Sequence, residues 1–278
     1  MEKVSVYIPV YNGALYLDKT LEGILQQTIP FAEIIIIDDG SQDNSVQIAQ
    51  QYPVKIISHK SNQGIALTRN TGVQHCCYEL VASVDADCVL DRRWLERCLP
   101  FFDNPSITGV GGKLDEAKED TCVNAWRSIH LIQHFGETVK EVSFLPGSNT
   151  LFRKKELCSI GLYNAYYRLY HEDIDLSERL IQAGKKLMYT SKAQAFHIKK
   201  DTLRSVMRTC WGFRHKDYPH TGVVLTKDMW RECVHSISIV IKDVFHKRFR
   251  LLLIDGVYLF IQTYFCIKAY FLKTINFK

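Results

Sequence analysis

The segment VASVDADC, residues 81–88, places two carboxylates at the end of an apolar run. In an extended chain, residues two positions apart point to the same side, so Asp85 and Asp87 should project together. Two anions this close repel each other unless a cation lies between them. Mg²⁺ and Mn²⁺ bind through one or two carboxylates together with substrate phosphates, so we predict a metal contact at Asp87 and a ribose or metal-bound water at Asp85. The alternative is a solvated loop after a strand.

A second acidic segment, HEDIDL at residues 171–176, opens a predicted helix. A carboxylate here would act as a general base that takes the proton from an acceptor hydroxyl, and Asp173 is our candidate. Arg179, one to two turns further along, would restrain this acidic cluster or contact a diphosphate. The alternative is structural, because carboxylates in the first turn interact favourably with the positive end of a helix.

Two turns, PVYNG at 9–13 and DDGS at 38–41, follow neighbouring apolar runs. A carboxylate in the second turn would accept the imide N–H of uracil or the hydroxyls of a ribose, and Tyr11 would stack on a base. The alternative is an Asx turn that leads into the next helix, with Asp43 or Asn44 as its cap. The residues alone leave both interpretations open.

Two single polar residues each have a functional and a structural interpretation. Arg69 lies one turn into the helix that follows NQG at 62–64, where it suits the phosphates or the base edge of a nucleotide. A solvated helical arginine is the alternative. His197 ends the last strand-like run, where a neutral imidazole would complete the coordination of the metal. A lone histidine is more often structural.

Apolar runs alternate with helical patterns through the first 90 residues, which indicates βαβ units and a parallel sheet covered on both faces. Ligands gather at the carboxyl ends of such strands, where DDGS and DAD both fall. After residue 90 a mixed pattern suggests a second half around the same sheet. The predicted strands are 4–10, 33–38, 54–58, 80–85, 107–112 and 185–191, and the predicted helices after the first are 44–51, 65–77, 91–103, 121–135 and 172–183.

We therefore predict an α/β fold with a Rossmann-like, mixed and mostly parallel sheet flanked by helices. Residues 1–200 would form one domain, with a nucleotide-binding half at 1–90 and an acceptor-binding half at 91–200. Residues 201–278 would form a helical C-terminal extension. The apolar stretch 251–271 in it contains Asp255, Gln262 and Lys268, so we expect an interfacial or packed helix and not a transmembrane one.

Composition narrows the class of protein. The 278 residues are 46% hydrophobic and 23% charged, which is typical of a globular protein with a full core. The nine cysteines are odd in number and include no CxxC pair, which indicates reduced thiols and neither a disulfide framework nor a zinc site built on them. The N-terminus has no signal-peptide pattern.

The basic stretch KDVFHKRFR at 242–250 would favour anionic lipid headgroups. We therefore expect a cytoplasmic protein that lies at the inner face of a membrane. We expect no nucleic-acid partner.

Together these segments resemble the inverting, metal-dependent glycosyltransferases of the GT-A fold, and most closely family 2. The resemblance runs from Val4 to about Arg214 and includes the opening strand and helix, EIIIIDDGSQDNS, NQGIALTRNTG, SVDADC, LPGSNTLFRKKEL and HEDIDLSERL. It implies a nucleoside diphosphate sugar as donor, commonly a UDP-sugar, and a glycan or lipid-linked acceptor. It also implies single displacement with Asp173 as base, and Mn²⁺ or Mg²⁺ on Asp87 and His197.

The resemblance implies further site residues in two groups. The nucleotide-sugar group comprises Pro9, Val10, Tyr11, Asn12, Asp39, Gly40, Arg69, Asp85 and Ala86. The group around the donor sugar and acceptor comprises Gly147, Ser148, Asn149, Glu172 and Arg179. The QxxRW segment of processive synthases is absent, since Trp211 lies in CWGFRH. We therefore expect transfer of single sugars.

Two other functions would use a similar sheet. A sugar-1-phosphate nucleotidyltransferase should have a glycine-rich, arginine-containing loop after the first strand, where this chain reads PVYNGALY with one glycine. A non-catalytic scaffold that keeps the fold is disfavoured by the presence of Asp85, Asp87 and Asp173.

Overall fold

The computed structural model describes the backbone of residues 2–117, 120–214 and 226–275, and the side chains of 2–117, 120–213 and 234–264. The chain forms two compact units. One comprises Met1–Ala117 and Gln133–Lys199, and the other comprises Lys118–Ile132 and Lys200–Lys278. The sequence prediction assigned 118–132 to the first domain, but this segment packs with the C-terminal helices. The residues that it packs against follow residue 200 in the sequence, and a domain boundary drawn at one position in the chain cannot include such a contact.

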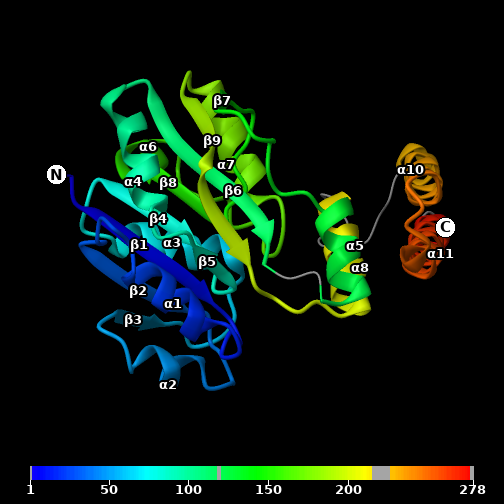
Figure 1. Ribbon diagram of the computed structural model, residues 1–278, viewed down its shortest axis with the longest axis horizontal. Coiled ribbons are helices and arrows are strands. Elements are labelled where there is room, and N and C mark those ends of the chain that lie inside the picture. The colour runs from blue at the N-terminus through cyan, green and yellow to red at the C-terminus, as the bar shows by residue number, and fades with distance from the viewer. Residues whose placement is uncertain (1, 118–119, 215–225, 276–278) are drawn as a thin grey trace. The chain divides into compact units, whose positions relative to one another are not determined.

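The first unit is built on a nine-stranded sheet (Figure 1). The strand order is β3-β2-β1-β4-β8-β6-β9-β5, with β7 paired to β9. Strands β1, β2, β3, β4, β6 and β9 run in one direction and β5, β7 and β8 run against them, so the sheet is mixed and mostly parallel. The strands are β1 Val4–Val10, β2 Glu33–Asp38, β3 Lys55–Ser58, β4 Leu80–Val84, β5 Cys88–Leu90, β6 Ile107–Glu116, β7 Lys140–Glu141, β8 Asn149–Arg153 and β9 Lys186–His197.

Helices cover both faces of this sheet, and each face has its own core. Along β1, Val6 and Ile8 pack into one core while Tyr7 between them packs into the other, as the alternation of side chains in a strand requires. The first core includes residues of α1 Leu17–Leu25, α2 Ser45–Ala49, α4 Trp94–Cys98 and the 3₁₀ helix η1 Leu99–Asp103. The second includes residues of α3 Ile65–His75, α6 Lys154–Ser159 and α7 Glu172–Gln182.

Two local details differ from the sequence prediction. The helix predicted at 91–103 is an α-helix only over Trp94–Cys98, because Pro100 opens a 3₁₀ turn at Leu99–Asp103. Proline lacks the N–H that a continued α-helix needs at this position. The short strands β5 and β7 were not predicted, since two or three residues carry no periodicity.

The second unit is helical. Its elements are α5 Cys122–His130, α8 Leu203–Arg214, α10 Thr226–Phe245, the 3₁₀ helix η2 Phe249–Leu251 and α11 Leu252–Ile275. Its core brings together residues of all these elements, including Trp126, Met207, Ile239, Leu251 and Tyr258. None of the helices in the described part of the chain has the length and hydrophobicity of a membrane span.

Candidate functional site

The carboxyl ends of β1, β2 and β4 lie at one edge of the first unit's sheet, because these strands are parallel neighbours. The predicted turns and the Asp85/Asp87 segment follow these three strands (Figure 1). Strand β8 pairs antiparallel with β4 and matches Asn149 with Val84, so the segment before β8 arrives at the same edge. Segments from both halves of the sheet therefore meet at this edge.

Asp85 is the centre of the polar cluster at this edge. Its backbone N–H donates to the Ser148 carbonyl at 3.0 Å, and its carboxylate accepts from Nη2 of Arg69 at 2.9 Å. Burial raises the pKa of the Asp85 carboxyl, the Arg69 guanidinium opposes this rise, and the charges of Asp87 and Asp173 add to it. The three carboxyl groups therefore influence one another within a single region.

Arg69 is almost fully buried, with 3% of its side chain exposed. Its Nη2 also lies 3.8 Å from Oε1 of Glu172, while its Nε and Nη1 have no hydrogen-bond partner among the described residues. A Cβ added to Gly147 would lie 1.4 Å from Nη1 of Arg69, so only glycine leaves room for this guanidinium. The buried guanidinium therefore places positive charge directly behind the strand edge, where it would attract an anionic ligand.

Glu172 and Asp173 open α7 and have different environments. Glu172 is buried, and burial followed by the charge of Asp173 raises its pKa to about 8, against the opposing effect of Arg69. The Asp173 carboxylate accepts the N–H of Gly147 at 3.0 Å and that of Ile174 at 2.8 Å. These two bonds fix the Asp173 carboxylate beside the segment that precedes β8.

Asp87 and His197 come together because β5 pairs with β9, with Cys88 opposite His197. Oδ2 of Asp87 lies 3.5 Å from Nε2 of His197, and Nδ1 of His197 lies 3.0 Å from Oε2 of Glu116. In the tautomer that donates Nδ1–H to Glu116, the Nε2 lone pair of His197 would point toward Asp87 and could bind a cation there. Metal-binding histidines are commonly held by a carboxylate in this way, so the donor set fits a divalent ion.

The two turns after β1 and β2 are tied to each other. The N–H of Asp39 donates to the Val10 carbonyl at 2.7 Å. The N–H of Asn12 donates to the Ser41 hydroxyl, and the side-chain oxygen of Asn12 accepts from the N–H of Gln42. Gly40 has a φ of 74°, and a Cβ there would lie 2.9 Å from the backbone of Ser61. The turn therefore requires glycine.

Asp39 is 3% exposed and holds the loop before α3. Its carboxylate accepts the N–H groups of Gln63 and Gly64 at 2.8 and 2.9 Å and lies 2.7 Å from Nδ1 of His59. Tyr11 is 51% exposed at the end of β1. The contact of Asp39 and Tyr11 with a nucleoside stays a prediction.

Most of the remaining predicted residues lie at the strand edge already described. Pro9, Val10, Ala86, Ser148 and Asn149 lie at the same strand edge, where Asn149 accepts the N–H of Gly112 at 2.9 Å and Ala86 accepts from Thr20 at 2.9 Å.

Arg179 is placed differently. It donates to Asp175 and to the carbonyls of Ile160 and Leu162 at 2.6–2.8 Å. All three guanidinium nitrogens are thus engaged in local contacts, which agree with the restraining role and leave a diphosphate contact without support.

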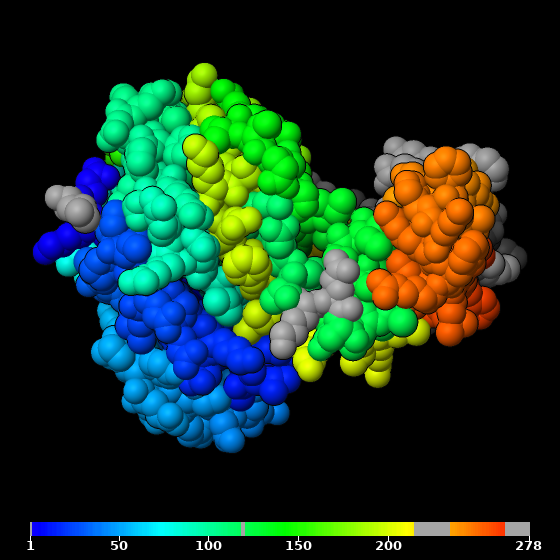
Figure 2. Space-filling view, in the orientation of Figure 1, coloured from blue at the N-terminus to red at the C-terminus, as the bar shows by residue number. Residues whose placement is uncertain are grey.

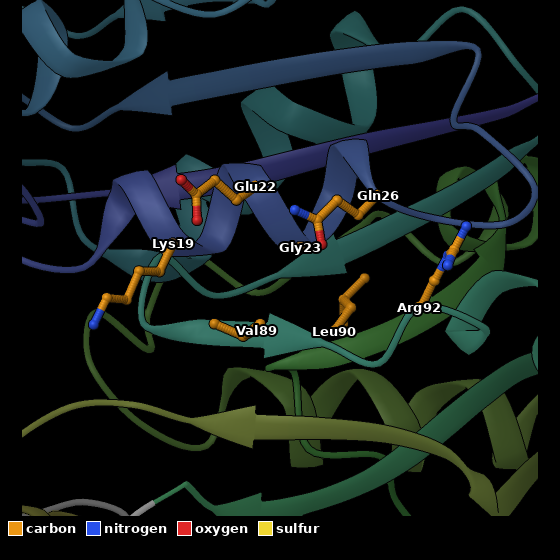
Figure 3. Close-up of a pocket in the computed structure, with 7 residues that line it drawn as sticks. All are labelled: Lys19, Glu22, Gly23, Gln26, Val89, Leu90 and Arg92. Carbon is orange, nitrogen blue, oxygen red and sulfur yellow. The ribbon is translucent and has the colours of Figure 1, made fainter.

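A separate groove of about 290 Å³ lies between α1 and β5 (Figure 3). It is lined by Lys19, Glu22, Gly23, Gln26, Val89, Leu90 and Arg92. None of the predicted site residues lines it. The groove is therefore distinct from the strand edge that gathers the acidic residues.

The family model for glycosyl transferase family 2 matches residues 5–176. The chain therefore belongs to this family and is an enzyme of the transferase type. Its sheet and helices form a GT-A fold. The chain is 34% identical over 119 residues to glycosyltransferase AglE of Haloferax volcanii, covering 40% of this chain and 39% of the relative.

Two further proteins are similar over longer stretches. The pre-mycofactocin glycosyltransferase of Mycobacterium tuberculosis is 28% identical over 211 residues, which cover 72% of this chain and 44% of that protein. The structure of GalNAc-T7 with UDP, GalNAc and Mn²⁺ matches with a TM-score of 0.59 at 18% identity, covering 78% of this chain and 49% of that one. The chain thus spans less than half the length of these relatives.

Sequence reasoning missed Glu116 and His59. Glu116 reaches His197 because the pairing of β6 with β9 places the two residues opposite each other. They are 81 positions apart in the sequence, so no local pattern reveals this contact. His59 directly follows β3, beside β2. The rule that carboxyl ends of parallel strands share an edge would have identified His59 as a neighbour of Asp39.

Proposed function

We propose that this chain is an inverting glycosyltransferase that moves one sugar from a UDP-sugar to a hydroxyl of a glycan or lipid-linked acceptor. The observation that supports it most is the convergence of Arg69, Asp85 and Asp173 at one strand edge, with Gly147 contacting both Arg69 and Asp173. A diphosphate and an attacking hydroxyl need this combination of cation and anchored carboxylate. The structurally similar GalNAc-T7 holds UDP and Mn²⁺ in its crystal structure, which agrees with this donor class.

Asp87 and His197 would hold the divalent ion. The fit rests on the 3.5 Å approach of their ligand atoms and on the Glu116 carboxylate that orients the imidazole. When bound, Mn²⁺ or Mg²⁺ supplies Lewis-acid stabilisation of the charge that develops on the diphosphate leaving group. Arg69 and Asp85 position the nucleotide portion of the donor beside this pair.

Asp173 would remove the proton from the acceptor hydroxyl as its oxygen attacks the anomeric carbon. The C–O bond to the acceptor forms as the bond to the diphosphate breaks, so one displacement inverts the configuration. The two backbone N–H groups hold the Asp173 carboxylate in the position from which it would act. Glu172, with its raised pKa, would keep its proton near neutrality and limit repulsion within the pair.

We further propose that the second unit rests on an anionic membrane surface on the cytoplasmic side. Exposed apolar residues recur every three to four positions on α10 and continue into η2 and α11: Val234, Ile237, Ile241, Val244, Phe245, Phe249, Leu253, Phe260 and Tyr264. The exposed basic residues Lys242, Lys247 and Arg250 flank them. Helix α10 forms much of the visible face of this unit in Figure 2. An apolar stripe edged with cations is the pattern of an interfacial helix.

The test is a panel of nucleotide sugars assayed for manganese-dependent release of UDP, with Asp87→Ala and Asp173→Asn as variants. We expect turnover with one donor class, loss of metal dependence in Asp87→Ala, and loss of turnover with retained UDP binding in Asp173→Asn. Arg93→Ala is the control, since the Arg93 side chain is 58% exposed and pairs with Glu96 at the protein surface. Equal turnover in all the proteins would remove this mechanism.

A further inference from the structure

The second unit contains a buried polar cluster that glycosyl transfer does not use. It comprises His130 on α5, Asp243 on α10 and Asp255 on α11. The side chains of His130 and Asp243 are 7% and 0% exposed, and Asp255 is fully buried. A ring nitrogen of His130 and one carboxylate oxygen from each aspartate all lie within 4.8 Å of one another. Three separate helices thus bring an imidazole and two carboxylates to one point.

The partners of these groups leave part of the cluster unsatisfied. Oδ2 of Asp243 lies 3.1 Å from Nε2 of His130, and Oδ1 of Asp243 accepts from Nη1 of Arg248 at 3.2 Å. Oδ1 of Asp255 accepts from the indole of Trp126 at 2.7 Å, while its buried Oδ2 has no hydrogen-bond partner among the described residues. An unpartnered carboxylate oxygen inside a helical core is costly unless another group binds it.

The charges of the cluster do not balance either. Two carboxylates are buried, but the described contacts supply one guanidinium, on Asp243, and it is 35% exposed. The ligand atoms of the two carboxylates lie within 4.8 Å of each other, so their charges repel. Positive charge at the centre of the cluster would relieve this repulsion.

The polar character of this helix pair continues beyond the cluster. Ser236 precedes Asp243 by seven residues and Gln262 follows Asp255 by seven, so each lies on the same face of its helix as the carboxylate. Both are fully buried, and their side-chain polar atoms have no partner among the described residues. The inner faces of α10 and α11 therefore bury further polar side chains besides the two carboxylates.

We propose that His130, Asp243 and Asp255 bind a divalent ion of the Zn²⁺ class. Zinc takes imidazole nitrogen and carboxylate oxygen as ligands, and three protein ligands leave one position for water. The ion would connect α5 to the α10–α11 pair, and its ligands His130 and Asp243 are 113 positions apart in the sequence. Because metal binding by distant ligands is linked to folding, its role would be to stabilise the second unit. This site is separate from the Asp87/His197 pair and independent of the proposed transfer reaction.

The alternative is an internal ion network in which a protonated His130 balances the carboxylates. Metal counting in the full chain separates the two. All proteins carry Asp87→Asn, so that the proposed catalytic metal site does not contribute. After chelator treatment, the chain is dialysed against Zn²⁺ and the bound zinc is measured by mass spectrometry. Asp255→Asn, which keeps an oxygen for Trp126, and His130→Gln are the test variants, and Asp115→Asn, at a partly exposed position of β6, is the matched control.

We expect one equivalent of zinc in the Asp87→Asn chain and in the control, and its loss in both test variants. Thermal unfolding should shift upward with Zn²⁺ only where zinc binds. Co²⁺ provides a readout that needs no variant at the cluster, because it should give a visible absorption band that Zn²⁺ abolishes. Zinc content unchanged by Asp255→Asn, or no zinc and no Co²⁺ band in the parent chain, would overturn the proposal.

Discussion

Replacing Gly147 with alanine tests whether the buried position of Arg69 serves donor binding. The new Cβ would lie 1.4 Å from Nη1 and 2.4 Å from Cζ of Arg69, so the guanidinium must move. The clash falls on the end of a long side chain and Gly147 has no positive φ, so the backbone can stay in place. What is lost is the 2.9 Å bond from Arg69 to Asp85.

The size of the effect on donor binding follows from the contact that the displaced Arg69 would no longer make with the diphosphate. A charged hydrogen bond of this kind contributes about 1.5–3 kcal/mol, and 1.36 kcal/mol corresponds to a factor of ten, so affinity for the donor should fall by about 10- to 150-fold. The assays are manganese-dependent binding of UDP by titration calorimetry and kcat/KM for UDP release. Chemical denaturation should show a loss of unfolding free energy of about 1.5–3 kcal/mol, for the broken Arg69–Asp85 bond, with a single cooperative transition retained.

Gly256→Ala is the matched control. A Cβ at Gly256 meets no atom within 4 Å, and the residue lies on the exposed side of α11. Alanine there should stabilise the helix by about 0.5–1 kcal/mol and leave UDP binding unchanged. If Gly147→Ala kept wild-type affinity and turnover, the buried position of Arg69 would not matter for the donor and the reasoning would be refuted.

Three other changes test separate parts of the molecule. Asp173→Asn should lower turnover by about 10²- to 10⁴-fold with unchanged UDP affinity, and a shift in affinity alone would contradict its role as base. Glu172 has its pKa raised to about 8, so its contribution to stability is present below about pH 4.5 and is lost as the pH rises through about 8. The wild-type protein should therefore lose unfolding free energy between about pH 5 and about pH 9, and Glu172→Gln should make this loss smaller by about 1–3 kcal/mol. If unfolding free energy fell equally with pH in both proteins, this role of Glu172 would be excluded. Phe245→Glu with Leu253→Glu should abolish flotation with anionic vesicles, whereas Leu15→Glu in the first unit should not; both residues changed on the second unit are 81% exposed.

The βα order of the first half and the acidic strand ends could be predicted from local patterns. The strands 4–10 and 33–38 are observed at the predicted residues, because runs such as VSVYIPV and EIIIID are apolar on both faces. Element ends were less accurate. The helix predicted at 121–135 ends at His130, and the strand predicted at 185–191 continues to His197, since pairing with β5 and β6 extends it.

The predicted site residues were found by type and spacing, but their partners were not. The approach of Gly147 to Arg69 joins residues 78 positions apart, and nothing near either residue indicates it. The position of Arg179 also depended on distant carbonyls, at Ile160 and Leu162. Such contacts arise from strand register and loop packing, which have no signature in a local window.

The sequence by itself determined which chemical groups follow which strand, because side-chain periodicity and turn residues act over a few neighbouring positions. That was enough to place Asp39, Asp85 and Asp87 at strand ends. Only the tertiary structure decided that Glu116 orients His197, and that His130 meets Asp243 and Asp255. These residues meet through sheet pairing and helix packing, where burial of distant apolar surfaces fixes the geometry and the polar groups must find partners in the space that remains.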